Sequence, residues 1–65
     1  MNSSKIYILG VDDMVISYHA TRDGAVEKAK ELGLVKPGEG LEQDLFSETL
    51  TNQGGLVIEP VELCG

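Results

Sequence analysis

The chain has 65 residues, of which eleven are acidic and five basic, and its formal net charge of −6 argues against binding nucleic acid through its phosphates. This length allows one small domain, residues 1–65, that buries only about 60% of its unfolded surface, so a second copy or a partner would add stability. A single cysteine, Cys64, excludes an internal disulfide, and the N-terminal run is neither a signal peptide nor a membrane span, so we expect a soluble cytoplasmic protein with a free thiol.

The acidic residues are concentrated in the second half of the chain. Residues 1–33 contain four basic and five acidic side chains, a net charge of −1, whereas residues 34–65 contain one basic and six acidic side chains, a net charge of −5. We therefore predict an acidic surface that binds a basic surface of a protein partner, although these charges would also serve solubility alone. The predicted partner-binding residues are Glu39, Glu42, Asp44, Glu48, Glu59 and Glu62.

Residues 1–4 are polar and are predicted to fray, and the densest apolar run of the chain, residues 5–20, follows them. Its alternation predicts a β-hairpin with an even-numbered loop around Asp12 and Asp13. In that register Val11 lies opposite Met14, Leu9 opposite Ile16, and Tyr7 opposite Tyr18. We expect this wholly apolar face to pack against the helix that follows.

The opposite face of the predicted hairpin is too apolar to be an ordinary solvated surface. It contains Ile6, Ile8, Val15 and His19. We predict self-association through these four residues, giving a homodimer. The buried back would supplement a thin core that has only three aromatic side chains, Tyr7, Tyr18 and Phe46.

A helix is predicted over about residues 22–32, because Thr21 is a typical N-cap residue. Its apolar stripe consists of Ala25, Val26, Ala29 and Leu32. Gly33 followed by Leu34 suits a left-handed C-cap with its hydrophobic contact. The helix should therefore lay this stripe on the apolar face of the hairpin.

Turns and short apolar runs follow the helix. Residues 36–40, KPGEG, read as a flexible connector, and residues 41–51 are ambiguous between helix and strand. Residues 52–55, NQGG, predict a turn before a strand over Leu56–Leu63, in which Pro60 indicates an edge position or a bulge.

This order of elements predicts an α+β fold, in which one helix packs on one face of a small antiparallel or mixed sheet. The expected topology is β-β-α-β. It becomes β-β-α-β-β if residues 46–51 form a fourth strand.

No residue pattern predicts a catalytic, cofactor-binding or metal site. His19 is the only histidine, and nothing in the spacing brings it beside Cys64. Asp12 and Asp13 fit a solvated turn better than a metal site, because no loop of calcium-binding spacing surrounds them. A small enzyme or metal-binding protein that uses His19 or these aspartates is the alternative from a different class.

The predicted helix, TRDGAVEKAKEL, and the final acidic strand, LVIEPVEL, resemble in this order those of small uncharacterised phage and prophage proteins. The resemblance covers residues 5–34 and 56–63. It implies an inhibitor of host machinery, and it assigns no site residue.

Our leading hypothesis is a non-enzymatic acidic interaction module that binds a basic surface of a host defence or nucleic-acid-handling protein. An antitoxin-like neutraliser of a basic toxin is one alternative. A DNA mimic is another, because carboxylates two positions apart on a strand, such as Glu42 and Asp44, lie about 7 Å apart, similar to phosphate spacing along one strand.

Overall fold

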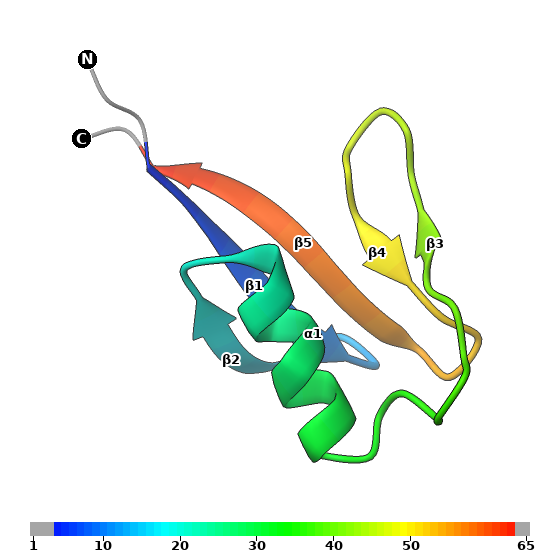
Figure 1. The fold of residues 1–65 in the computed structure, drawn as a ribbon. Helices are drawn as coiled ribbons and strands as arrows, with labels where there is room; N and C mark the ends of the chain where they lie inside the picture. The colour runs from blue at the N-terminus through cyan, green and yellow to red at the C-terminus, as the bar shows by residue number, and fades with distance from the viewer. Residues whose placement is uncertain (1–3, 64–65) are drawn as a thin grey trace.

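The computed structural model describes residues 4–63, which form a five-stranded antiparallel sheet with one helix on one of its faces (Figure 1). The strands lie in the order β2-β1-β5-β4-β3. The elements are β1 (Ser4–Val11), β2 (Met14–His19), α1 (Arg22–Glu31), β3 (Glu42–Gln43), β4 (Leu50–Thr51) and β5 (Leu56–Leu63). The predicted α+β class is confirmed. The predictions for residues 1–3 and for Cys64 concern positions outside the described residues.

The turn between β1 and β2 has the even, two-residue loop expected from the sequence. Asp12 and Asp13 both adopt left-handed backbone angles, with φ of 50° and 68°. Two successive positive φ values match the type I′ turn, whose twist suits antiparallel strands. Val11 lies opposite Met14, as the sequence predicts.

The predicted register also holds for Gly10 and Val15, but from Leu9 onward it is wrong, because a β-bulge adds one residue to β2. The register shifts between Leu9 and Gly10, so that Leu9 lies opposite Ser17 and Tyr7 opposite His19. Gly10 accommodates the irregularity, since a Cβ there would lie 3.1 Å from the Met14 carbonyl oxygen. One inserted residue reverses the face of every residue that follows it in the strand.

Because of the bulge, the residues of β2 that follow it lie on the opposite faces from those predicted. His19 lies opposite Tyr7 and not on the face of Ile8, so the grouping of His19 with the apolar back is wrong. Tyr18, predicted to face the helix, lies opposite Ile8 on that back. Three β2 side chains predicted to pack against the helix are exposed and lie outside the core. They are Met14 (64% exposed), Ile16 (42%) and Tyr18 (64%).

Helix α1 begins and ends by the predicted local signals. The Thr21 hydroxyl accepts a hydrogen bond from the Gly24 N–H at 3.0 Å, which caps the first turn. At the other end Gly33 has φ 77°, and the Leu34 N–H donates to the Ala29 carbonyl at 2.8 Å. This bond closes a Schellman-type cap.

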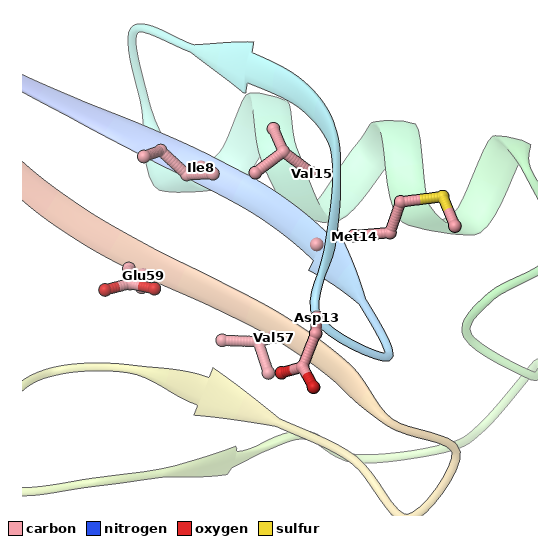
Figure 2. Close-up of a pocket in the computed structure, with 7 residues that line it drawn as sticks. Ile8, Asp13, Met14, Val15, Val57 and Glu59 are labelled. Carbon is pink, nitrogen blue, oxygen red and sulfur yellow. The ribbon is translucent and has the colours of Figure 1, made fainter.

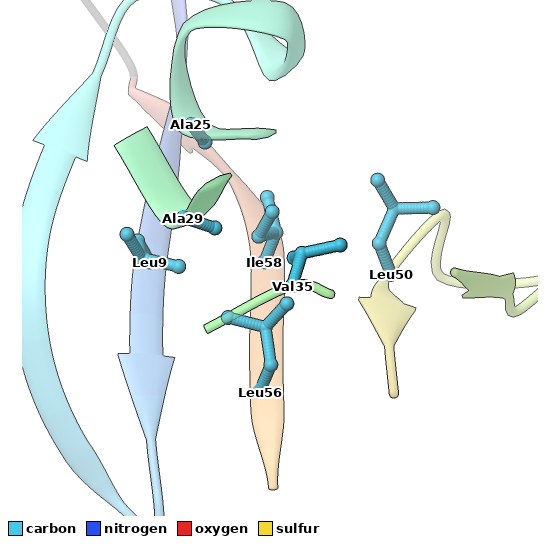
Figure 3. Close-up of a cluster of buried hydrophobic side chains, with 7 residues drawn as sticks. All are labelled: Leu9, Ala25, Ala29, Val35, Leu50, Leu56 and Ile58. Atoms are coloured by element: carbon cyan, nitrogen blue, oxygen red, sulfur yellow. The ribbon is translucent and has the colours of Figure 1, made fainter. Parts of the chain in front are cut away.

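The core lies between α1 and the sheet and extends under the loop that follows the helix (Figure 3). Its buried residues are Leu9, Ala25, Ala29, Val35, Leu50, Leu56 and Ile58. Two alanines on α1 let the helix approach β1 and β5 closely. Leu32, predicted in the stripe, is the C-cap residue and is 47% exposed, and Val35 from the loop is buried in the core.

β1 and β5 pair along their whole lengths, and their outer ends lie together at one end of the molecule (Figure 1). Ser4, the last residue of the predicted polar lead-in, is paired with Leu63, because β5 extends as far as β1. β4 pairs with β5 no further than Ile58. β5 is the middle strand of the sheet and its pairing with β1 has no bulge at Pro60, so the predicted edge strand or bulge is wrong. Pro60 is tolerated because it lies beyond the end of β4, where β1 is the only paired neighbour of β5 within residues 4–63.

Residues 36–51 fold as two successive turns rather than as a helix. Lys36 and Glu39 close the first, with the Glu39 N–H donating to the Lys36 carbonyl at 2.9 Å and the Lys36 N–H to Glu39 Oε1 at 3.0 Å. The ambiguous stretch 41–51 becomes a hairpin in which β3 pairs with β4. Phe46 lies in the loop of this hairpin and not in a strand.

Candidate functional site

The six predicted acidic residues do not form one continuous surface. Glu42, Asp44 and Glu48 belong to the β3–β4 hairpin, the segment 42–51. Glu39 lies in the turn after α1 and lines a hollow together with Glu42, so it adjoins the hairpin. Glu59 lies opposite Ile8 on the face away from the helix, and Glu62 lies opposite Lys5 near the end of β5. The hairpin and the adjoining turn therefore contain four of the six predicted residues.

Asp44 organises the loop at the tip of the hairpin. Its Oδ1 accepts hydrogen bonds from the Phe46 N–H at 2.7 Å and the Ser47 N–H at 3.2 Å. The backbone N–H of Asp44 donates to the Thr49 carbonyl at 2.9 Å, and its carbonyl accepts from the Glu48 N–H at 2.8 Å. The bonds from Phe46 and then Ser47 hold the pKa of the Asp44 carboxyl below its ordinary value, because they stabilise the charged form.

A second set of contacts fixes the hairpin to the rest of the molecule. Glu48 has a left-handed φ of 60°. Its Oε1 accepts a hydrogen bond from Arg22 Nη2 at 3.0 Å, and the two side chains form an ion pair. The Arg22 guanidinium also lies 5.8 Å from the centre of the Tyr7 ring, within range of a cation–π contact. The tip is thus connected both to the start of α1 and to β1.

Leu45 and Phe46 stand on this organised loop with 88% and 100% of their surfaces exposed. Sequence reasoning placed Phe46, the chain's only phenylalanine, in the core and did not single out Leu45. The signal that indicates otherwise is local. Asp44 two residues before Phe46 matches an Asx-turn, in which an aspartate accepts from the backbone two residues on. The exposed apolar pair lies within the acidic segment DLFSE.

The sheet face opposite the helix contains a shallow hollow of about 260 Å³ (Figure 2). Its lining residues are Ile8, Gly10, Asp13, Met14, Val15, Val57 and Glu59. Ile8 and Val15, predicted for self-association, are therefore brought together, whereas Ile6 lies further along β1. Asp13 and Glu59 each place a carboxylate at this hollow. Within residues 4–63 no group of three or more His, Cys, Asp or Glu is arranged to hold a metal ion.

Ser17 and His19 form a side-chain hydrogen bond of 2.7 Å between Oγ and Nε2. Such a pair places a hydroxyl beside a base, which is the first requirement of nucleophilic catalysis. Gly24 of α1 lies against the His19 ring, since a Cβ there would be 3.7 Å from its Nδ1. The hollow on the opposite face is lined by other residues, so the pair faces the helix and not that hollow.

Comparison with protein-family models, with curated proteins and with solved structures finds no match to this chain. Among the described residues, no helix has the length and apolar character needed to cross a membrane.

Proposed function

We propose that the protein is a non-enzymatic acidic interaction module whose β3–β4 hairpin docks into an apolar pocket rimmed by basic side chains on another protein. One observation carries the proposal. Leu45 and Phe46 are 88% and 100% exposed on a loop that is held in one conformation by backbone hydrogen bonds to Asp44.

A partner that covers the fully exposed Phe46 would remove a large apolar surface from water. Burying such a side chain contributes about 1.5–3 kcal/mol, and an aromatic anchor in a fitted pocket commonly dominates an interface. The Asp44 bonds fix the backbone of Phe46 before binding, so less conformational entropy is lost on association. The tip therefore has the character of a preformed anchor.

Charge supports a basic rim around the partner's pocket. Glu42, Asp44 and Glu48 flank the apolar pair on the hairpin, and each keeps exposed surface. Carboxylates in this position attract lysine and arginine during encounter and repel acidic surfaces, which favours rate and specificity more than affinity. The net charge of −6 adds a longer-range attraction for a basic partner.

An inhibitor of a host defence or nucleic-acid-handling protein, of the phage type that the sequence resemblance implies, fits this module. An antitoxin-like neutraliser of a basic toxin would use the same surface. The DNA-mimic alternative has weaker support, because β3 ends at Gln43 and Asp44 is committed to the turn, so no strand presents Glu42 and Asp44 at phosphate spacing.

Affinity capture from the native host tests the proposal with matched variants. Phe46→Ser and Glu42→Lys should each remove the same protein from the captured set. Leu32→Ser and Glu27→Lys, at exposed positions of α1 and its C-cap, should retain it. Circular dichroism should be unchanged in all four variants. Retention of every captured protein by Phe46→Ser would contradict the proposal.

A second candidate function rests on the 2.7 Å contact between Ser17 and His19, which would suit a small hydrolase. Hydrolysis of p-nitrophenyl acetate by the purified chain, lost in both Ser17→Ala and His19→Gln, would favour this alternative. Equal background rates in all three proteins would dispose of it.

A further inference from the structure

We propose that two copies of the chain associate edge to edge through β2, which pairs antiparallel with β2 of the second copy and continues the sheet across the dimer. The inference concerns the edge of the sheet furthest from the β3–β4 hairpin, and it does not rest on the proposed function. Its occupant is a second copy of this chain.

β2 is an edge strand without charged side chains. It is terminal in the order β2-β1-β5-β4-β3, so within residues 4–63 its outer side has no strand partner. Soluble proteins protect such an edge with charged side chains, proline or a β-bulge. β2 has the bulge, but its sequence, MVISYH, contains no acidic residue, lysine, arginine or proline.

Exposed apolar surface is concentrated on this strand. Its four large apolar side chains are Met14 (64% exposed), Val15 (53%), Ile16 (42%) and Tyr18 (64%). On the inner strands of the same sheet, Ile6, Ile8 and Val57 are only partly exposed. A contact along β2 would therefore remove more apolar surface from water than a contact at the centre of the face.

Charge favours edge pairing over stacking of the two sheet faces. Glu59 lies opposite Ile8 on that face and lines its hollow. Face-to-face packing would bury this carboxylate in both copies, which is unfavourable without a cationic partner. Edge pairing through β2 leaves Glu59 at the surface of β5, which is two strands in from β2.

Edge pairing also separates the most acidic parts of the two copies. The β3–β4 hairpin lies at the other end of the strand order, so a two-fold axis at β2 places the two hairpins at opposite ends of the combined sheet. Residues 1–33, which include β2, carry a net charge of only −1. Antiparallel pairing of β2 with β2 of the second copy also satisfies two-fold symmetry. Both copies contribute the same surface, and whenever one residue contacts another across the interface, the reverse contact is also made.

The test is the mass of the chain in solution, measured by analytical ultracentrifugation from roughly 1 µM to 1 mM, a range that includes weak dimers. Wild-type protein should approach twice its 7.0 kDa chain mass as concentration rises. Tyr18→Lys and Val15→Lys each place a charge on the paired edge and should stay at 7.0 kDa. Phe46→Lys, an equally charged control at the hairpin tip, should dimerise like wild type. Circular dichroism confirms folding of each variant.

A monomeric wild type across this range would overturn the inference, and so would dimers that persist in both β2 variants. Isotope-filtered nuclear Overhauser measurements on a mixed labelled sample provide a check without mutation. Contacts between copies should connect β2 to β2, and contacts connecting Ile6 or Val61 across copies would establish face stacking instead. Phe46→Lys separates the two proposals, because it should lose the protein partner and keep the dimer.

Discussion

Arg22 and Glu48 are 26 positions apart in the sequence, and their side chains meet at 3.0 Å between Nη2 and Oε1. The contact joins the first residue of α1 to the loop that presents Leu45 and Phe46. Arg22 also lies over the Tyr7 ring, so one side chain connects the hairpin, the helix and β1. We attribute the fixed direction of the hairpin to this connection together with the pairing of β4 to β5.

A double-mutant cycle with Arg22→Ala and Glu48→Gln should give a coupling of about 0.5 kcal/mol at low salt, because both side chains keep solvent access. The coupling should fall in 1 M salt, where the screening length shortens to about 3 Å. Urea unfolding measures it. Arg22→Ala alone should destabilise the protein more than Glu48→Gln, because it also removes the contact with Tyr7. Zero coupling at low salt would contradict the assigned role.

The loop of the β3–β4 hairpin should depend on pH through Asp44. The folded-state pKa of this carboxyl lies below its ordinary value of 3.8, so its stabilising contribution is fully present above that value. The contribution is lost as the pH falls through the lower folded-state pKa. The amide resonances of Phe46 and Ser47 should therefore shift together with a midpoint below 3.8.

Asp44→Asn provides the control for this titration. The asparagine oxygen can still accept from both N–H groups, but it has no proton to gain in this range. The turn should persist and the common midpoint should disappear. Amide shifts in Asp44→Asn that still follow the wild-type titration would assign the effect to another carboxylate.

The turn between β1 and β2 should be improved by Asp12→Asn combined with Asp13→Gly. Both positions have positive φ, which is unfavourable for most side chains by about 1–2 kcal/mol, and Asn-Gly is the preferred pair for this turn type. We expect the free energy of unfolding to rise by about 0.5–1 kcal/mol in thermal or urea melts. A decrease would mean that an aspartate side chain supports the turn.

Gly55 should tolerate no side chain, because it combines φ of 89° with close approach to Asp12. A Cβ there would overlap the Asp12 carboxylate, and the Gly55 carbonyl also accepts from the Asp12 N–H at 3.2 Å. Gly55→Ala should destabilise the protein by about 1–3 kcal/mol. Gly40→Ala is the matched control, since no atom lies within 4 Å of a Cβ at that position, and it should change stability by less than about 0.5 kcal/mol.

Elements with local signals could be predicted from the sequence. Thr21 and Gly33 mark the ends of α1 because caps depend on a few neighbouring residues. The Asp12-Asp13 loop followed from strand parity. The bulge opposite Leu9 could not be predicted, because it depends on how β2 meets β1 and leaves no periodic trace.

The candidate site was harder to predict for a related reason. β3 and β4 have two residues each, too few for an alternation to appear. The scarcity of aromatic residues therefore suggests that Phe46 belongs to the core, although the turn at Asp44 leaves its side chain exposed. The acidic charges were visible, but only the fold separates those on the hairpin from Glu59 and Glu62.

The most direct test of the central claim places a photoreactive phenylalanine analogue at position 46 and irradiates the native host cells. We expect a covalent adduct with one other protein, whose crosslinked peptide comes from an apolar pocket flanked by lysine or arginine. The same analogue at the exposed control position 32 should give no such adduct. Adducts of equal pattern at positions 32 and 46, or none at 46, would contradict the claim that the hairpin tip is the docking element.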